Sequence, residues 1–269
     1  MFNLISKASR RADQMPQRIM MVDPQPERAK MLGELMRDLC RAEIWSAPSN
    51  AKALKLAAKV DAQLIFCELS GDKVDGVAFT RSLRRSDLAC RQAPVILVAH
   101  QVATEHRLAA RDAGAHELLH RPFTLKDLTR RVEAAVLYPR DWVEAVDYVG
   151  PDRRRFASAD YAGPLKRLAD HSPTSDTVRI GQALKILKSA VQAVEREPQQ
   201  ALRAMLAQAM ILQVAADGVA DRRLAAAAHE LHEHLMAARS LGEPPIRAEV
   251  ERRAAPLLAQ LPREDRAAA

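Results

Sequence analysis

The sequence contains few aromatic residues and no long apolar run. Aromatic residues make up 4% of the 269 residues, whereas 48% of the residues are hydrophobic. The hydrophobic cores must therefore consist mainly of alanine, leucine, valine, isoleucine and methionine. No apolar run approaches the ~20 residues that a membrane-spanning helix needs, so the sequence predicts no transmembrane segment.

Cysteines are also scarce. Cys40, Cys67 and Cys90 are odd in number and far apart, which excludes a disulfide framework and matches no metal-binding spacing. Residues 1–17 have a short apolar patch followed by charges, unlike a signal peptide, and we expect them to be flexible. We therefore expect a cytoplasmic protein, because cysteines stay reduced in that compartment.

The net charge of +7 at pH 7 is compatible with a nucleic acid, an anionic ligand or an acidic partner. Aromatic residues do not alternate with the basic runs, which argues against a platform for stacking single-stranded bases. The preference for arginine over lysine and the high alanine content also fit a GC-rich genome. The charge alone therefore predicts no partner.

Residues 18–138 alternate between strand-like and helix-like segments. Apolar or strand-like runs lie at 18–23, 42–47, 63–68, 94–100 and 116–120. Segments with helical spacing lie at 26–39, 49–60, 76–85, 103–114 and 124–137. This alternation predicts a parallel sheet covered by helices on both faces. Ligands of such sheets bind beyond the carboxyl ends of the strands.

The pattern changes after residue 138. Residues 139–177 are rich in proline, glycine and serine, so we expect a linker with some local structure. An all-α domain is expected over residues 178–262, suited to dimerisation or partner binding. Its predicted helices span 178–197, 199–216, 221–241 and 246–261, the last kinked at Pro256.

Motifs at four predicted strand ends resemble the receiver domain of two-component response regulators. They are "MMVDP" (20–24), "LIFCEL" (64–69) with the Asp-Gly that follows, "PVILVA" (94–99) and "RPF" (121–123). The resemblance covers a little under half of the chain. It implies a flavodoxin-like (βα)5 fold with strand order 2-1-3-4-5.

The resemblance also implies a set of site residues. Active receivers accept a phosphoryl group on an aspartate at the third strand end, which holds Mg²⁺ together with an acidic pair after the first strand. A hydroxyl after the fourth strand and a lysine after the fifth hold the phosphoryl oxygens. In this sequence, Asp23 matches one acid of the pair, Glu68 the phospho-acceptor, Ala99 the hydroxyl position and Arg121 the lysine.

These positions depart from the family pattern, and each departure argues against phosphotransfer. Pro24 removes one acid of the pair, and Ala99 has no hydroxyl. Glu68 carries its charge one carbon–carbon bond, ~1.5 Å, further out than aspartate would, while Arg121 can pair with it bidentately. We therefore expect a phosphorylation-independent pseudo-receiver that is not an enzyme and needs no metal or cofactor. Glu68 then either imitates phosphoaspartate or belongs to a structural ion pair.

A receiver without phosphotransfer is expected to act through protein contacts. In the family, the face formed by the fourth helix, fifth strand and fifth helix binds partners, and it corresponds here to residues 103–137. We expect an adaptor or regulator in bacterial signalling that binds proteins, with a homodimer through the C-terminal helices as a further expectation.

The segment "YVGPDRRRF" (148–156) is a second candidate site. Arg153, Arg154 and Arg155 can pair with phosphates and stack on purines, and Asp152 can accept from the edge of guanine. The alternative function is therefore a cyclic-di-GMP effector. A solvated linker, or arginines that pair with acids of the receiver, is the competing explanation.

Two further interpretations are weaker. "HELHEHL" (229–235) fails the zinc-protease signature, because Glu233 stands where the second histidine is needed. His229 as a phosphotransfer histidine is less convincing than a polar surface helix. Nucleic-acid binding is not expected, because the C-terminal helices carry acids beside their bases and show no helix-turn-helix pattern.

Overall fold

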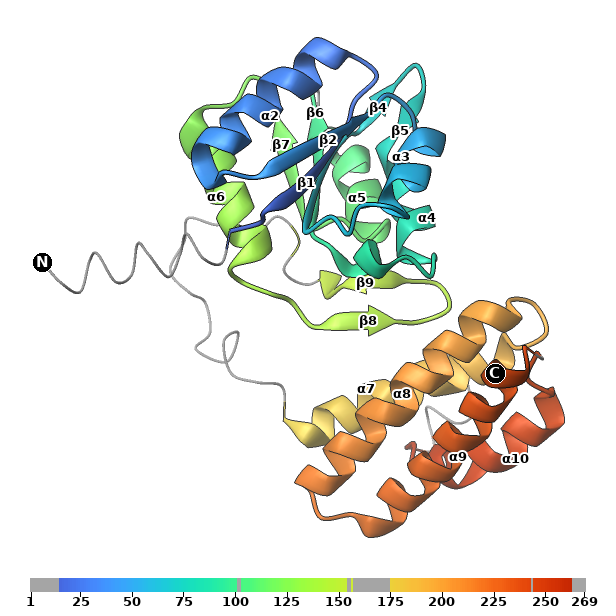
Figure 1. Cartoon of the computed structure of the whole chain (residues 1–269). Coiled ribbons are helices and arrows are strands. Elements are labelled where there is room, and N and C mark those ends of the chain that lie inside the picture. The colour runs from blue at the N-terminus through green and yellow to red at the C-terminus, as the bar shows by residue number, and fades with distance from the viewer. Residues whose placement is uncertain (1–14, 101–102, 154–155, 157–174, 243, 263–269) are drawn as a thin grey trace, which may run out of the picture. The chain divides into compact units, whose positions relative to one another are not determined.

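The computed structural model describes residues 15–100, 103–153, 156, 175–242 and 244–262. The chain divides into two compact units (Figure 1). The first unit, called the receiver unit because it contains the segment that resembles a receiver domain, comprises residues 1–143 and 149–162, and the helical unit comprises residues 144–148 and 163–269.

The receiver unit is built on a five-stranded sheet in which all neighbouring strands are parallel. The strand order is β2-β1-β3-β6-β7, which confirms the expected flavodoxin-like arrangement. The strands are β1 (Arg18–Val22), β2 (Glu43–Ala47), β3 (Leu64–Glu68), β6 (Val95–Ala99) and β7 (Glu117–His120).

Alternation along the strands supplies two hydrophobic cores, one on each face of the sheet. Successive side chains of a strand point to opposite faces, so Ile65 and Phe66 of β3 belong to different cores. All residues of β3 and β6 are buried, because helices cover both faces. This double burial explains why these strands read as continuous apolar runs in the sequence.

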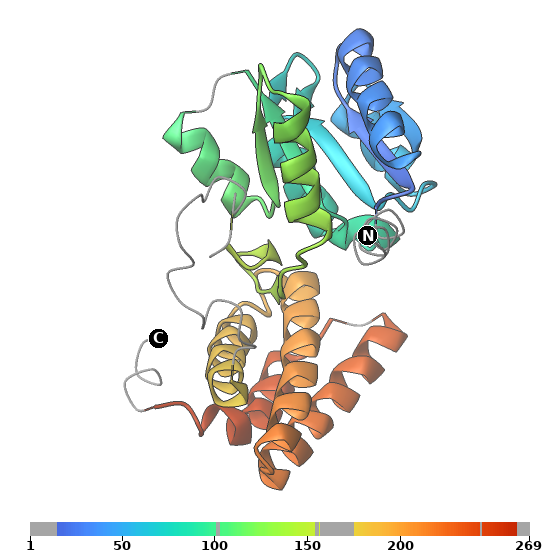
Figure 2. The same ribbon diagram turned by 90° about the vertical axis from the view of Figure 1, so that its left-hand side faces the viewer.

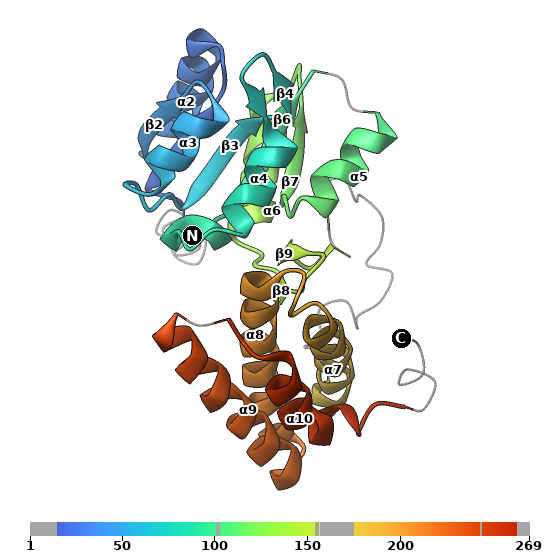
Figure 3. The same cartoon turned by 90° about the vertical axis from the view of Figure 1, so that its right-hand side faces the viewer.

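The helices form a layer on each face. α2 (Pro26–Cys40) and α6 (Leu125–Val136) pack on one face, and Figure 2 shows them in front of the sheet. α3 (Asn50–Ala57), α4 (Gly76–Arg84) and α5 (Thr104–Asp112) cover the other face, which Figure 3 shows.

Local signals fix several helix ends. The Ser49 side chain accepts a hydrogen bond from the backbone N–H of Lys52, and Thr124 forms a capping box with Asp127, so both residues cap their helices. Gly114 follows α5 with a φ of +86°, a conformation that side chains with a Cβ rarely adopt. Gly114 therefore allows the chain to leave the helix at this point.

Several short elements were not predicted. β4 (Ser70–Gly71) and β5 (Val74–Asp75) form an antiparallel hairpin directly after β3, and η1 (Ala89–Gln92) is a 3-10 turn. Within the predicted linker, β8 (Trp142–Glu144) and β9 (Val149–Pro151) form a two-stranded sheet. Strands of two or three residues leave too little periodicity to be recognised in a sequence.

The described residues of the helical unit form four helices, as expected. They are α7 (Asp176–Gln192), α8 (Pro198–Gly218), α9 (Arg222–Leu241) and α10 (Arg247–Leu258). The predicted ends of the first and last helices were too late, because α7 ends five residues and α10 three residues earlier than expected. α10 includes Pro256 and ends two residues after it. The kink expected at Pro256 stays a prediction.

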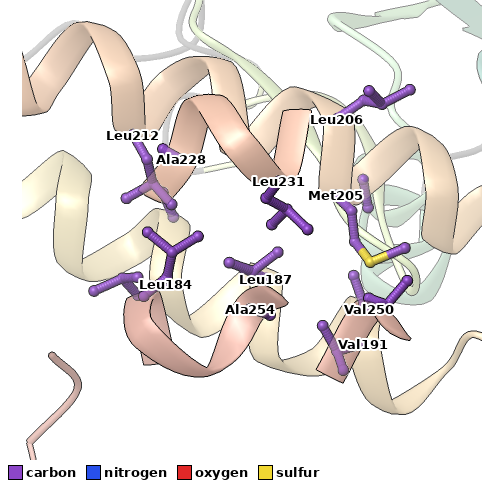
Figure 4. Packing of buried hydrophobic residues seen from close by; sticks show 14 of the residues in the cluster. Leu184, Leu187, Val191, Met205, Leu206, Leu212, Ala228, Leu231, Val250 and Ala254 are labelled. Carbon is purple, nitrogen blue, oxygen red and sulfur yellow. The ribbon is translucent and has the colours of Figure 1, made fainter. Parts of the chain in front are cut away.

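The core of the helical unit is made of leucine, valine, methionine and alanine side chains from all four helices (Figure 4). Its buried members include Leu184, Leu187, Val191, Met205, Leu212, Leu231, Leu235, Val250 and Leu257. Alanines such as Ala204 and Ala254 lie in the same cluster, and their small side chains let the helix backbones approach closely. Within the described ranges, no helix is long and apolar enough to cross a membrane.

Residues 144–148 belong to the helical unit, although they lie far from its helices in the sequence. Val146 is part of the helical core. The buried Gln200 side chain donates to Glu144 Oε1 and to the carbonyl of Ala145, both at 3.0 Å, and Gln208 donates to the carbonyl of Glu144 at 2.9 Å. These bonds satisfy polar groups that would otherwise be costly to bury.

Candidate functional site

The parallel register brings the predicted site residues to one edge of the receiver sheet. Val22 of β1 pairs with Cys67 of β3, so Asp23 and Glu68 follow side by side at the carboxyl ends of neighbouring strands. Arg121 follows β7, and its backbone N–H donates to the carbonyl of Ala99 at 2.7 Å. The structure therefore gathers all four positions that the family resemblance indicated.

Arg121 lies between two buried carboxylates. Its Nη1 donates to Glu68 Oε2, and its Nη2 donates to Asp23 Oδ2 at 3.4 Å. Asp23, Glu68 and Arg121 are only 7%, 4% and 9% exposed. Arg121 pairs with Glu68, as expected. The expectation of a bidentate pair was wrong, because the second branch of the guanidinium fork donates to Asp23.

Arg28 is a site residue that the sequence reasoning missed. It projects from the first turn of α2, and its Nη2 lies 3.1 Å from Asp23 Oδ1. Its Nη1 lies 3.1 Å from Nε2 of His100, just beyond the end of β6. The backbone N–H of Gln25 also donates to Asp23 Oδ1, at 2.8 Å. Both oxygens of Asp23 are thus engaged by donors.

Pro24 has a packing role at this edge. A Cβ atom added to Gly71 would lie 2.9 Å from Cγ of Pro24, which shows how closely the β4–β5 hairpin covers the proline. The Asp-Gly pair that ends the hairpin also has a steric reason. Asp75 caps α4 by accepting from Ala78 N–H, and a Cβ on Gly76 would lie 2.5 Å from the carbonyl oxygen of Glu68.

The space left among these side chains is small. A cavity of about 10 Å³ is lined by Asp23, Arg28, Glu68 and Arg121 together with apolar residues of β1, β3, β6 and α2. A volume of this size holds about one water molecule. A phosphoryl group is considerably larger, so it would require these side chains to move.

The residues at this edge do not fit a divalent cation. Mg²⁺ demands near-octahedral coordination by oxygens, but the carboxylates of Asp23 and Glu68 are paired with guanidinium groups. Pro24 offers no side-chain oxygen. Across the part of the chain that the structure describes, no group of three or more histidine, cysteine, aspartate or glutamate residues is placed to hold a metal.

Comparison with known proteins agrees with the parallel sheet of this unit. Residues 19–133 match the model of the response regulator receiver domain family. These residues form a receiver domain.

Curated relatives resemble the chain over about the length of this domain. The chain is 29% identical over 117 residues to the transcriptional regulatory protein PrrA of Mycobacterium leprae, a match that covers 44% of this chain and 48% of PrrA. It is 25% identical over 117 residues to the DNA-binding dual master transcriptional regulator RpaA of Synechocystis, with the same coverage of each chain. The chain thus spans about half the length of the curated relatives it matches.

Solved structures of similar proteins include a putative response regulator from Chloroflexus aurantiacus. It is 24% identical with a TM-score of 0.42, and the match covers 45% of this chain and 98% of that one. Another is the receiver domain of a sensor histidine kinase from Pseudomonas aeruginosa, at 21% identity and a TM-score of 0.41, with 45% and 97% covered.

Cys67 precedes Glu68 in the receiver domain but does not replace it as a nucleophile. Burial raises the pKa of the Cys67 thiol well above its usual value, and the neighbouring carboxylates of Glu68 and Asp23 raise it further. Only the thiolate form of cysteine is a good nucleophile. Cys67 therefore behaves as a small apolar residue of the core.

The second predicted site is described only in part. Arg154 and Arg155 lie outside the described residues. Nη1 of Arg153 lies 3.4 Å from Oδ1 of Asp112, the last residue of α5. Arg111 also pairs with Asp112, and hydrogen bonds from Arg111 and Arg153 lower the pKa of this carboxyl group. Arg153 thus pairs with an acid of the receiver domain, as the competing explanation expected.

The histidine-rich stretch lies on the surface of the helical unit. His229 is exposed on α9. Glu230 pairs with Arg253 of α10 at 2.8 Å, and Nδ1 of His232 lies 3.6 Å from Glu233. These contacts agree with the interpretation of a polar surface helix, and they bring no further metal-binding side chain to His229.

Proposed function

We propose that this chain is a non-enzymatic signalling protein whose receiver domain acts as a pseudo-receiver, through protein contacts and without phosphorylation. One observation carries the proposal: the guanidinium of Arg121 donates to Glu68 and Asp23 at once, inside a buried site. The same two carboxylates would have to be free for metal binding and for nucleophilic attack.

The physical argument concerns geometry and charge. A nucleophile must be held close to its attack position, and a displacement of one carbon–carbon bond is large on that scale. Glu68 is longer than aspartate, and its carboxylate is paired with Arg121. A buried ion pair of this kind persists because separating it would leave uncompensated charges in a poorly solvated site. The pair then holds the strand ends in one arrangement.

Partner binding is proposed for the face formed by α5, β7 and α6. Leu108 of α5 is 45% exposed and Leu125 of α6 is 56% exposed, although most of their exposed neighbours are polar. Contiguous exposed apolar patches mark contact sites, whereas single exposed apolar residues are common on any surface, so the two leucines serve here as probes of the proposed face. Residues 176–262 carry nearly as many acids as bases, so we do not extend the DNA-binding role of the Synechocystis relative to this chain.

The phosphorylation claim is tested with acetyl phosphate and Mg²⁺, followed by mass spectrometry of the intact protein. We expect no mass increase in the wild type, nor in Glu68→Asp, because Pro24 and Ala99 remain unchanged. A receiver domain with an aspartate acceptor shows that the reagent is active. A stable phosphoryl adduct on the wild-type chain would overturn the proposal.

The contact claim is tested by affinity capture from the native cell with matched variants. We expect Leu108→Glu and Leu125→Glu to lose a protein that the wild type retains. Met31→Glu is the control, because Met31 is similarly exposed on α2, away from the proposed face. Capture that is unchanged by both leucine variants would show that this face is not the binding surface.

A further inference from the structure

The carboxyl edge of the receiver sheet contains a connected row of charges. Glu68 pairs with Arg121, Arg121 with Asp23, and Asp23 with Arg28. Two carboxylates are therefore balanced by two guanidinium groups. Carboxylates that share a buried site repel each other and need a nearby positive charge to stay ionised, and in this site arginines supply it.

Arg28 is held in place from several directions. Asp23 and His100 contact the two ends of its guanidinium fork, each at 3.1 Å. Its side chain is 22% exposed, and it lines the cavity together with Ala29 and Leu32 of the same helix. A planar fork fixed by two partners is more ordered than a lysine at the same position would be.

We propose that Arg28 supplies the positive charge that a divalent cation would otherwise supply at this edge, so that the receiver domain is stable without any metal ion. This inference concerns the same site as the proposed function, but it makes a separate claim about what neutralises Asp23. It follows from the misfit between the residues present and a magnesium site, because Arg28 occupies one oxygen of Asp23 and Arg121 occupies the other.

The proposal has a consequence for variants. Removal of the Arg28 charge would leave the Gln25 N–H as a donor to Asp23 Oδ1 and leave the site with one negative charge in excess. A hydrated magnesium ion binds through one or two carboxylates, so it would find a place there. A variant without Arg28 should therefore depend on magnesium for part of its stability, whereas the wild type should not.

The experiment compares the melting temperature of the full chain in EDTA and in millimolar magnesium chloride. Tryptophan fluorescence reports on the receiver unit, because Trp45 and Trp142 both belong to it. We expect the wild type to melt at the same temperature in both solutions. Arg28→Met, which keeps an apolar stem, should melt lower in EDTA by about 5 °C and regain at least half of that loss in magnesium.

Arg130→Met is the matched control. Arg130 pairs with Asp127 at 3.4 Å on the exposed surface of α6, so its loss should produce no magnesium dependence. Arg28→Lys keeps the charge without the fork, and we expect it to remain independent of magnesium. It also provides a readout if Arg28→Met does not fold.

Several outcomes would overturn the proposal. One is a wild type that magnesium stabilises. A second is an Arg28→Met variant that melts like the wild type, or one whose lost stability magnesium does not restore. A third is an Arg28→Lys variant whose melting temperature depends on magnesium. These results are distinct from those of the phosphorylation test. Magnesium-stabilised wild type without a phosphoryl adduct would refute the role of Arg28 alone, and an adduct on a magnesium-independent wild type would refute the proposed function alone.

Discussion

The two edges of the receiver sheet both contain buried arginines, and Arg121 at one edge and Arg84 at the other differ in their partners. At the carboxyl edge, Arg121 contacts the carboxylates of Asp23 and Glu68. At the amino edge, the fully buried Arg84 at the end of α4 donates to the backbone carbonyls of Gly114 and Ala93, at 3.0 and 2.9 Å.

The amino edge also contains an aromatic residue and a buried histidine. The guanidinium carbon of Arg84 lies 5.4 Å from the ring centre of Trp142, and that of Arg91 lies 5.6 Å from it. Such distances are typical of cation–π contacts. Nδ1 of His116 lies 3.3 Å from Arg84 Nη2 and also accepts from the backbone N–H of Val95.

The difference teaches that burial of an arginine does not by itself mark a functional site. Neutral carbonyls and an aromatic ring bind the cation of Arg84 and fix the loops before β6 and β7, which is a structural role. Arg121 forms ion pairs with two carboxylates, at the edge where sheets of this type bind ligands. A carboxylate partner is not enough to mark a site, because Arg131 and Arg140 pair with the buried carboxylate of Glu117 at the start of β7. The position of Arg121 at the carboxyl edge, together with its partners, separates it from Arg84.

The largest expected effect tests the structural role of the amino edge. Arg84→Met should lower the free energy of unfolding of the receiver unit by about 4 kcal/mol, because several buried carbonyls lose a charged donor. Urea unfolding followed by tryptophan fluorescence measures it. Arg81→Met on the exposed side of α4 is the control and should stay within about 0.5 kcal/mol of the wild type. An Arg84 variant as stable as this control would contradict the comparison.

The next effect concerns the carboxyl edge. Arg121→Met should lower the free energy of unfolding by about 3 kcal/mol, because it leaves two buried carboxylates short of positive charge. Adding Glu68→Gln to this variant should restore part of the loss, and a double-mutant cycle should give a coupling of about 1–3 kcal/mol. Strictly additive effects of the two substitutions would show that the pair is not coupled.

A smaller effect concerns pH. Burial lowers the pKa of His116 well below its usual value, and the charges of Arg84 and Arg140 lower it further. The unfolded chain therefore takes up a proton near pH 6.5 that the folded chain does not, so stability decreases as the pH falls. We expect a loss of about 1 kcal/mol between pH 6.5 and pH 5.5 from this group.

The variant His116→Gln should remove this part of the pH dependence in urea unfolding experiments. His120→Gln is the control, because His120 is exposed at the end of β7. If both variants keep the wild-type slope between pH 6.5 and pH 5.5, His116 is not the titrating group.

The smallest effect is expected outside both edges. Arg153 and Asp112 are 46% and 38% exposed in their side chains, and exposed ion pairs contribute about 0–1 kcal/mol. Arg153→Ala should therefore change the stability of the receiver unit by less than about 0.5 kcal/mol. A larger loss in urea unfolding would place Arg153 among the structural arginines.

Binding of cyclic-di-GMP through Asp152, Arg153, Arg154 and Arg155 remains a prediction. Titration calorimetry of the wild type with the dinucleotide tests it, beside a variant in which the three arginines are replaced by alanine. Heat of binding that the variant loses would support an effector role. Absence of binding to the wild type, or binding that survives the replacement, would end this alternative.

The sequence allowed much of the receiver fold to be predicted. Continuous apolar runs such as 63–68 identified strands buried on both faces, and Ser49 and Thr124 marked helix starts. The short β8 and β9 strands could not be predicted, because they are fixed by packing against distant residues rather than by their own pattern.

The sequence by itself determined which residue types stand at the strand ends: Glu68 where an aspartate is expected, and Pro24, Ala99 and Arg121 beside it. The sequence also indicated that these residues lie close together, because the carboxyl ends of parallel strands meet at one edge of the sheet. Only the tertiary structure decided that Arg121 divides its fork between two carboxylates and that Arg28 reaches Asp23. Such contacts depend on differences of an ångström in how helices pack on a sheet, which a pattern of residue types does not encode.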